Sequence, residues 1–142
     1  MPVRDATTLA ETAASHWGSA AVRVGGSSGF PGDAPVLEPA DTAVLGDMLR
    51  WAGGERVGVV PCGGGTKLQW GASPTPPDIV LSTARLATGI DHCAGDLTAV
   101  LPAGATLASV NAALGRERQW LTLDPARGLR AKIGRASCRE RV

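Results

Sequence analysis

The sequence has few cysteines, almost no net charge and no long apolar run, and each shortage excludes a class of protein. Its 142 residues include three cysteines, and one of them, Cys138, lies in the last ten residues. The other two, Cys62 and Cys93, have neither the spacing of a metal site nor the density of a disulfide framework. No apolar run approaches the ~18 residues that span a bilayer. The N-terminus lacks the charged start and apolar core of a signal peptide. We therefore expect a soluble, cytoplasmic protein without a transmembrane segment or a metal site.

The last residues of the chain resemble a translated sequencing adapter. All ten codons of Ile133–Val142 agree with the in-frame reading of a common short-read adapter, and the two adapter bases before them fit the end of the Lys132 codon. An ordinary basic tail is the alternative. We expect 132–142 to be an artefact that carries no information on the fold. The chain is then cut near Arg130, and what followed is missing.

The net charge gives no sign of a nucleic-acid partner. The whole chain carries a formal charge of +1. The tail Ile133–Val142 contributes +2, through three arginines and one glutamate, so the rest of the chain carries −1. A nucleic-acid-binding domain is expected to show a basic excess, and none remains here.

Helix and strand signals alternate along the chain, which predicts an α/β or α+β layered domain. The predicted helices run from Ala6 to about Ser19 with Thr8 and Glu11 at capping-box spacing, from Thr42 to about Ala52 after Asp41, and from Leu107 to about Leu114 after Thr106. Short β-type runs predict the strands Val22–Val24, Arg56–Val60, Asp78–Thr83, Asp96–Leu101 and Gln119–Leu123.

Three consecutive glycines follow the predicted strand Arg56–Val60, in the stretch Pro61-Cys62-Gly63-Gly64-Gly65-Thr66-Lys67. Because glycines have no Cβ, an anionic group can come close to the backbone N–H groups that such a turn gathers in one concavity. The order of residues is neither that of a Walker A loop nor that of a Rossmann fingerprint. A flexible turn is the alternative. The β-type run before the loop and the segment Leu68–Gly71 after it favour a phosphate site.

Other residues with reactive side chains have simpler interpretations. A catalytic pair of Cys93 and His92 is conceivable, but neighbours on an extended chain point to opposite faces, so we expect a surface turn. His16 is expected to be a partly exposed helix residue. Cys62 is expected to fill space at the mouth of the glycine loop. The four tryptophans are expected in the core or at a pocket edge, and Trp70 follows the loop closely.

Four blocks of the sequence together resemble a known family: Pro61–Gly71, Asp78–Leu86, Gly95–Leu107 and Gln119–Pro125. The first resembles the pyrophosphate loop of FAD-linked oxidases of the vanillyl-alcohol oxidase / p-cresol methylhydroxylase type. The next two resemble the strand, turn and helix start that follow in that family, and the fourth resembles its "GQWLPLDPP" block. Within the family, the chain is most similar to proteins that resemble the FAD-binding subunit of glycolate oxidase.

The resemblance implies an α+β fold, the N-terminal part of a p-cresol methylhydroxylase-type FAD-binding domain, with a mixed sheet and flanking helices. Its loop is expected to hold the FAD pyrophosphate through backbone N–H groups. Members with covalent flavin often carry histidine where Thr66 stands, so non-covalent FAD is expected. Arginine is common where Cys62 stands, so a side-chain donor is lost there. The expected cofactor-binding residues are Pro61, Cys62, Gly63, Gly64, Gly65, Thr66, Lys67, Trp70, Asp124 and Pro125.

We therefore expect an N-terminal helical and loop segment over 1–35, a truncated FAD-binding domain over 36–131 and the artefact over 132–142. The family implies oxidation of a 2-hydroxy acid, glycolate- or lactate-like, or of a related alcohol, by hydride transfer to the flavin. With the substrate domain missing, no catalytic residue is predicted, and the fragment is expected to be inactive and to bind FAD weakly or not at all. The alternatives are a non-catalytic electron-relay subunit of a glycolate-oxidase-like complex and a non-flavin phosphate- or nucleotide-binding module.

Overall fold

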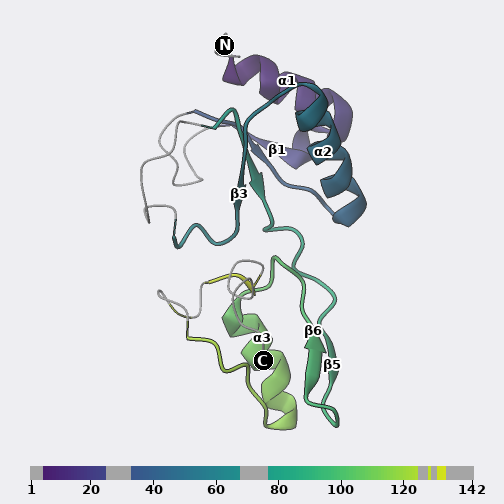
Figure 1. Cartoon of the computed structure of the whole chain (residues 1–142), viewed down its shortest axis with the longest axis vertical. Coiled ribbons are helices and arrows are strands. Elements are labelled where there is room, and N and C mark those ends of the chain that lie inside the picture. Colours follow the sequence, from purple (N-terminus) through teal and green to yellow (C-terminus); the bar gives the residue numbers. More distant parts are fainter. Residues whose placement is uncertain (1–4, 25–32, 68–76, 125–127, 129–130, 134–142) are drawn as a thin grey trace.

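The structure is a computed structural model that describes residues 5–24, 33–67, 77–124, 128 and 131–133. Figure 1 shows two groups of elements, which we call the N-terminal lobe and the C-terminal lobe. The N-terminal lobe contains α1 (Ala6–Trp17), β1 (Val22–Arg23), β2 (Val36–Leu37), α2 (Thr42–Gly54), β3 (Val59–Cys62) and β4 (Ile79–Ser82). The C-terminal lobe contains β5 (Asp91–Cys93), β6 (Thr98–Val100) and α3 (Leu107–Leu114).

The N-terminal lobe is built on a four-stranded mixed sheet with the strand order β1-β2-β4-β3. Both β2 and β3 pair in parallel with β4, whereas β1 pairs antiparallel with β2. The carboxyl ends of β2, β3 and β4 therefore lie at one edge of the sheet. The predicted α+β fold with a mixed sheet and flanking helices is confirmed.

Helices α1 and α2 pack on one face of this sheet (Figure 1). Side chains on the other face, those of Val36, Cys62 and Val80, form a second buried cluster. The strand β4 is buried at all its positions, as expected for a parallel strand that is covered on both faces. The core between the helices and the sheet includes Leu9, Ala13, Leu37, Met48, Ala52, Ile79 and Leu81.

Local capping explains where the helices begin. The carboxylate of Asp41 accepts a hydrogen bond from Val44 N at 2.8 Å, which confirms the predicted cap of α2. Thr106 and Ser109 form a reciprocal capping box at the start of α3. The helix α1 begins at Ala6 as predicted, but Asp5 caps it, so the predicted capping box of Thr8 and Glu11 is wrong. The helix α2 also continues beyond its predicted end, to Gly54.

The C-terminal lobe consists of α3 and the antiparallel hairpin of β5 and β6. The predicted apolar face of α3 is buried, with Leu107, Val110 and Leu114 in one cluster with Ile133. The backbone of Ile133 donates to Ala105 O at 3.0 Å. The last described residues therefore lie beside the start of α3.

One predicted strand is shifted in the structure, and another strand was not predicted. Arg56 has a positive φ of 54° and precedes β3, which begins only at Val59. The strand then continues through Pro61 to Cys62, because its backbone pairs with β4 as far as Ser82. The segment Asp91–Cys93, expected as a surface turn, forms β5 because it pairs with β6.

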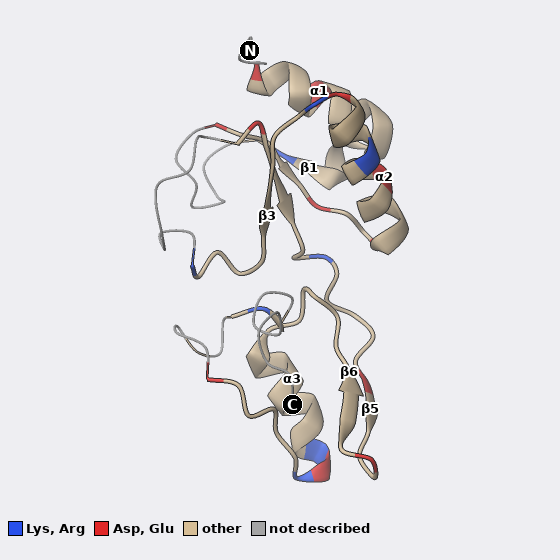
Figure 2. Cartoon of the chain, viewed as in Figure 1, with Lys and Arg blue, Asp and Glu red and all other residues tan. Residues whose placement is uncertain are grey.

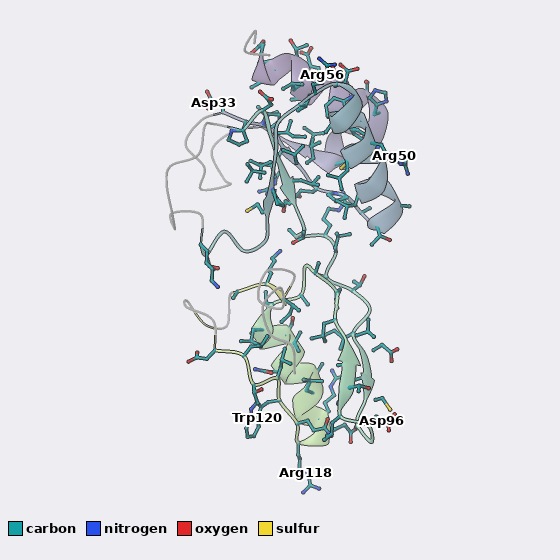
Figure 3. All side chains as sticks on the ribbon, viewed as in Figure 1. Asp33, Arg50, Arg56, Asp96, Arg118 and Trp120 are labelled. Atoms are coloured by element: carbon teal, nitrogen blue, oxygen red, sulfur yellow. The ribbon has the colours of Figure 1, made fainter. Side chains whose placement is uncertain are left out.

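The predicted strand Gln119–Leu123 is wrong. Its backbone bonds instead to the side chain of Asn111 in α3, and no strand pairs with it in the part of the chain that the structure describes. Trp120, expected in the core or at a pocket edge, is 71% exposed, and Figure 3 shows it pointing away from the ribbon. Trp17 and Trp51 do pack against the core of the N-terminal lobe.

Gly104 lies where the two lobes meet. A Cβ on this residue would lie 2.1 Å from Thr83 O and 2.6 Å from Leu86 O, so only glycine fits. Its own N–H donates to Leu86 O at 2.7 Å. The predicted turn Pro102–Gly104 therefore packs directly on the chain that leaves β4.

Figure 2 shows basic and acidic residues interspersed along both lobes. Arg23 forms an ion pair with Glu38, and Arg50 forms one with Asp47 on α2. Within the described ranges, no helix is both long enough and apolar enough to cross a membrane.

Candidate functional site

The residues that follow the three parallel strands meet at one edge of the sheet. Glu38 follows β2, Gly63 follows β3 and Thr83 follows β4. Cys62 is the partner of Ser82 in the register of β3 and β4. Thr83 N also donates to Cys62 O at 3.0 Å, so Gly63 and Thr83 lie side by side. Ligands of open sheets bind outside the carboxyl ends of parallel strands, which makes this edge the candidate site.

The glycine loop, Gly63–Lys67, begins directly at this edge. Gly65 has a φ of +68°, in the left-handed region that glycine adopts without strain. Gly64 is exposed and Gly63 is half-buried. A Cβ on Gly63 would lie 3.5 Å from Lys132 Cβ and 4.0 Å from Thr83 Oγ1. The loop therefore turns sharply and leaves part of its backbone open to a ligand.

Lys132 lies beside the start of the loop. Burial lowers the pKa of its amino group, and the neighbouring Cys62 and Glu38 oppose that shift. Cys62 is only 7% exposed, and its Sγ donates to Gly63 O at 3.7 Å. The pKa falls because the charged amine is poorly solvated there. Since Lys132 belongs to the segment predicted to be an artefact, we assign it no role in the site.

Thr83 brings an unpaired hydroxyl to the same edge. Its Oγ1 is buried and has no hydrogen-bond partner among the residues that the structure describes. Buried polar groups seldom lack partners, so a hydroxyl of this kind beside a glycine loop fits a phosphate group. The sequence prediction missed Thr83. The signal is its position, directly after a buried strand that pairs in parallel with the strand before the glycines.

Seven of the ten predicted cofactor residues lie together, because Pro61–Lys67 forms the end of β3 and the loop after it. Trp70 and Pro125 lie outside the described residues. Asp124 is exposed and follows Leu123, which packs on the core of the C-terminal lobe. The binding roles of all ten residues stay predictions.

His92 and Cys93 do not form a catalytic pair. His92 Nε2 lies 2.8 Å from Gln119 Oε1, whereas Cys93 Sγ donates to Asp96 Oδ2 at 3.2 Å.

A hollow of about 680 Å³ beside α3 and β5 is lined mostly by small side chains and contains none of the predicted site residues. In the described part of the chain, no group of three or more His, Cys, Asp and Glu residues is placed to hold a metal ion.

Comparison with known proteins places the candidate site inside a family. Residues 34–136 match a protein family described as "FAD binding domain". The D-2-hydroxyglutarate dehydrogenase of Xanthomonas citri pv. viticola is 35% identical over 81 residues, which are 57% of this chain and 17% of that protein. The D-lactate dehydrogenase of Archaeoglobus fulgidus is also 35% identical over 81 residues, which are 57% of this chain and 18% of that protein.

A solved structure gives the same fold. A variant of BBE-like 1 from Physcomitrella patens superposes with a TM-score of 0.52 at 21% identity, over 75% of this chain and 25% of that one. At this identity the likeness shows the fold alone. The chain matches less than a fifth of the length of its two curated relatives.

Proposed function

Because the chain belongs to the family of FAD binding domains, we propose that it is the N-terminal part of a flavin-dependent oxidoreductase and holds FAD at its glycine loop. The observation that carries this proposal is the position of the loop, at the carboxyl edge of three parallel strands and inside the segment that the family covers. When bound, FAD supplies an acceptor for the hydride of an alcohol. The part of this chain is to bind and orient the cofactor.

The loop offers the FAD pyrophosphate backbone donors. The N–H groups of Gly63, Gly64, Gly65 and Thr66 follow one another through a turn with a positive φ at Gly65. A run of N–H groups in such a turn forms a concavity for anions, and the missing Cβ atoms let a phosphate oxygen approach. The binding is proposed to be non-covalent, since Thr66 stands where covalent members often carry histidine.

A 2-hydroxy acid is the proposed substrate class. The two curated relatives are named for D-2-hydroxyglutarate and D-lactate, and both compounds are 2-hydroxy acids. Substrate binding is assigned to the part of the protein beyond the matched segment, so this chain alone is proposed to be inactive.

Cys62 and Cys93 are both thiols in the structure, which suits the reducing cytoplasm that we propose as its location.

A titration of the 142-residue chain with FAD, followed by flavin fluorescence or by calorimetry, tests the proposal. We expect weak but saturable binding, because the chain matches only a small part of its relatives. Gly65→Val is expected to abolish the binding, since a β-branched side chain does not tolerate the positive φ at this position. Gly95→Ala is the matched control, because its Cβ would meet no atom of the described residues within 4 Å.

Three outcomes separate the alternatives. Binding that is lost in Gly65→Val and kept in Gly95→Ala supports the proposal. Equal FAD binding by the wild type and Gly65→Val contradicts the role of the loop. Binding of ADP without binding of FAD contradicts the flavin proposal and favours a non-flavin nucleotide-binding module.

A further inference from the structure

Two hydroxyl groups lie at the end of β4, and their hydrogen bonding differs. Ser82 is 4% exposed, and its Oγ accepts a hydrogen bond from Ala84 N at 3.2 Å. Thr83 Oγ1 is buried as well, but it has no partner within the described ranges. A buried hydroxyl has given up its hydrogen bonds to water and normally makes others in the protein. The hydroxyl of Thr83 therefore has unused capacity to donate.

The unpaired hydroxyl lies next to the start of the glycine loop. Its Oγ1 is 4.0 Å from the position that a Cβ of Gly63 would occupy. Lys132 Cβ lies 3.5 Å from the same position. Since Gly63 has no Cβ, a ligand atom bound by the loop can approach Thr83 from this side once the Lys132 side chain moves away.

The backbone of Thr83 is held on both sides. Its N–H donates to Cys62 O at 3.0 Å, and its carbonyl accepts from Leu86 N at 3.0 Å. The same carbonyl lies against Gly104, where no Cβ could fit. The backbone that carries the hydroxyl is therefore held in place before any ligand binds, which reduces the entropy that binding has to overcome.

We propose that Thr83 is a further cofactor-binding residue, whose hydroxyl donates a hydrogen bond to a pyrophosphate oxygen of the FAD held by the glycine loop. This inference rests on the proposed function. A threonine hydroxyl has one proton to donate, and hydrogen bonds to a charged acceptor are stronger than those between neutral groups. The ends of two neighbouring parallel strands, β3 and β4, then hold the same anion.

The affinity of the full chain for FAD tests this role directly. Thr83→Val keeps the shape of the side chain and removes the hydroxyl, and we expect it to raise the dissociation constant for FAD about 10- to 100-fold. Thr83→Ser keeps the hydroxyl and is expected to bind FAD nearly as the wild type does. Ser82→Ala is the matched control, because it removes the neighbouring hydroxyl that already has a partner.

Thermal unfolding without FAD distinguishes a binding role of Thr83 from a structural role. Thr83→Val removes a buried group that has no partner among the described residues, so its Tm is expected to equal or exceed that of the wild type. Ser82→Ala removes a paired group and is expected to lower the Tm without changing the affinity for FAD.

The possible results distinguish a failure of the inference on Thr83 from a failure of the proposed function. If Thr83→Val binds FAD as tightly as the wild type while Gly65→Val does not bind, the inference fails and the proposed function stands. A lower Tm for Thr83→Val without FAD would show a structural role and overturn the inference. If the wild type binds no FAD, the inference fails together with the proposal that this chain holds FAD at its glycine loop.

Discussion

Replacing Gly104 by alanine places a methyl group inside the backbone that joins the two lobes. The new Cβ would lie 2.1 Å from Thr83 O and 2.6 Å from Leu86 O, whereas real Cβ atoms essentially never come within 3.0 Å of another heavy atom. Both neighbours are backbone atoms, so no flexible side chain can move aside. The chain that leaves β4 has to shift instead.

The expected loss of stability has two sources. Overpacking of a filled site costs about 1–3 kcal/mol. The hydrogen bond from Gly104 N to Leu86 O, 2.7 Å long, is weakened as the backbone moves, which costs about 0.5–1.5 kcal/mol. We therefore expect the free energy of unfolding to fall by about 2–4 kcal/mol, a large share of the stability of a small domain.

Urea denaturation followed by tryptophan fluorescence measures this change. Gly115→Ala is the control, because Gly115 has helical angles (φ −62°, ψ −20°) and its Cβ would meet no atom within 4 Å in the part of the chain that the structure describes. That control is expected to gain about 0.4–1 kcal/mol. A Gly104→Ala variant as stable as the wild type, with an unchanged m value, would refute the close approach of the two backbones. Because Thr83 borders the glycine loop, Gly104→Ala is also expected to weaken FAD binding.

Two further predictions concern the cap of α2 and the partly buried amine of Lys132. Asp41→Ala is expected to lower the free energy of unfolding by about 1 kcal/mol, since the hydrogen bond from Val44 N is lost. The control Asp47→Ala removes only an exposed ion pair and is expected to cost less than about 0.5 kcal/mol. Equal losses for the two variants in urea denaturation would contradict the role of Asp41 as the cap. Folding lowers the pKa of Lys132 below 10.5 because the amine is partly buried, so the unfolded chain binds more protons between the lowered value and 10.5. The wild type should therefore gain stability relative to Lys132→Gln as the pH rises through this interval, and parallel stability curves would show that folding does not desolvate the amine.

The fold could be predicted where short-range signals decide it. The caps Asp41 and Thr106 and the apolar spacing of α3 act within a few residues, so their prediction is confirmed. The strand Asp91–Cys93 has no such signal, because it forms only through pairing with β6. The segment Gln119–Leu123 has a β-type composition, but its backbone bonds to Asn111 of α3, and this long-range contact overrides the local preference.

Part of the candidate site could likewise be predicted from the sequence, and part of it could not. The glycine loop is contiguous, so the sequence alone could identify it, and the family predicted from this loop and three later blocks is confirmed by the match over 34–136. Thr83 could not be found from local sequence, because its place beside Gly63 depends on the parallel register of β3 and β4. Gly104 is predicted as a turn residue, but its tight fit against Thr83 O depends on how the lobes pack.

The most direct test of the account is an amide NMR titration of the isotope-labelled chain with FAD. If the cofactor binds at the carboxyl edge of the sheet, the amide signals of Gly63, Gly64, Gly65, Thr66 and Thr83 should shift together with one dissociation constant. The amides of α3, which belong to the other lobe, should shift less. Shifts confined to the C-terminal lobe, or no saturable shift at the glycine loop, would contradict the claim that this loop holds FAD.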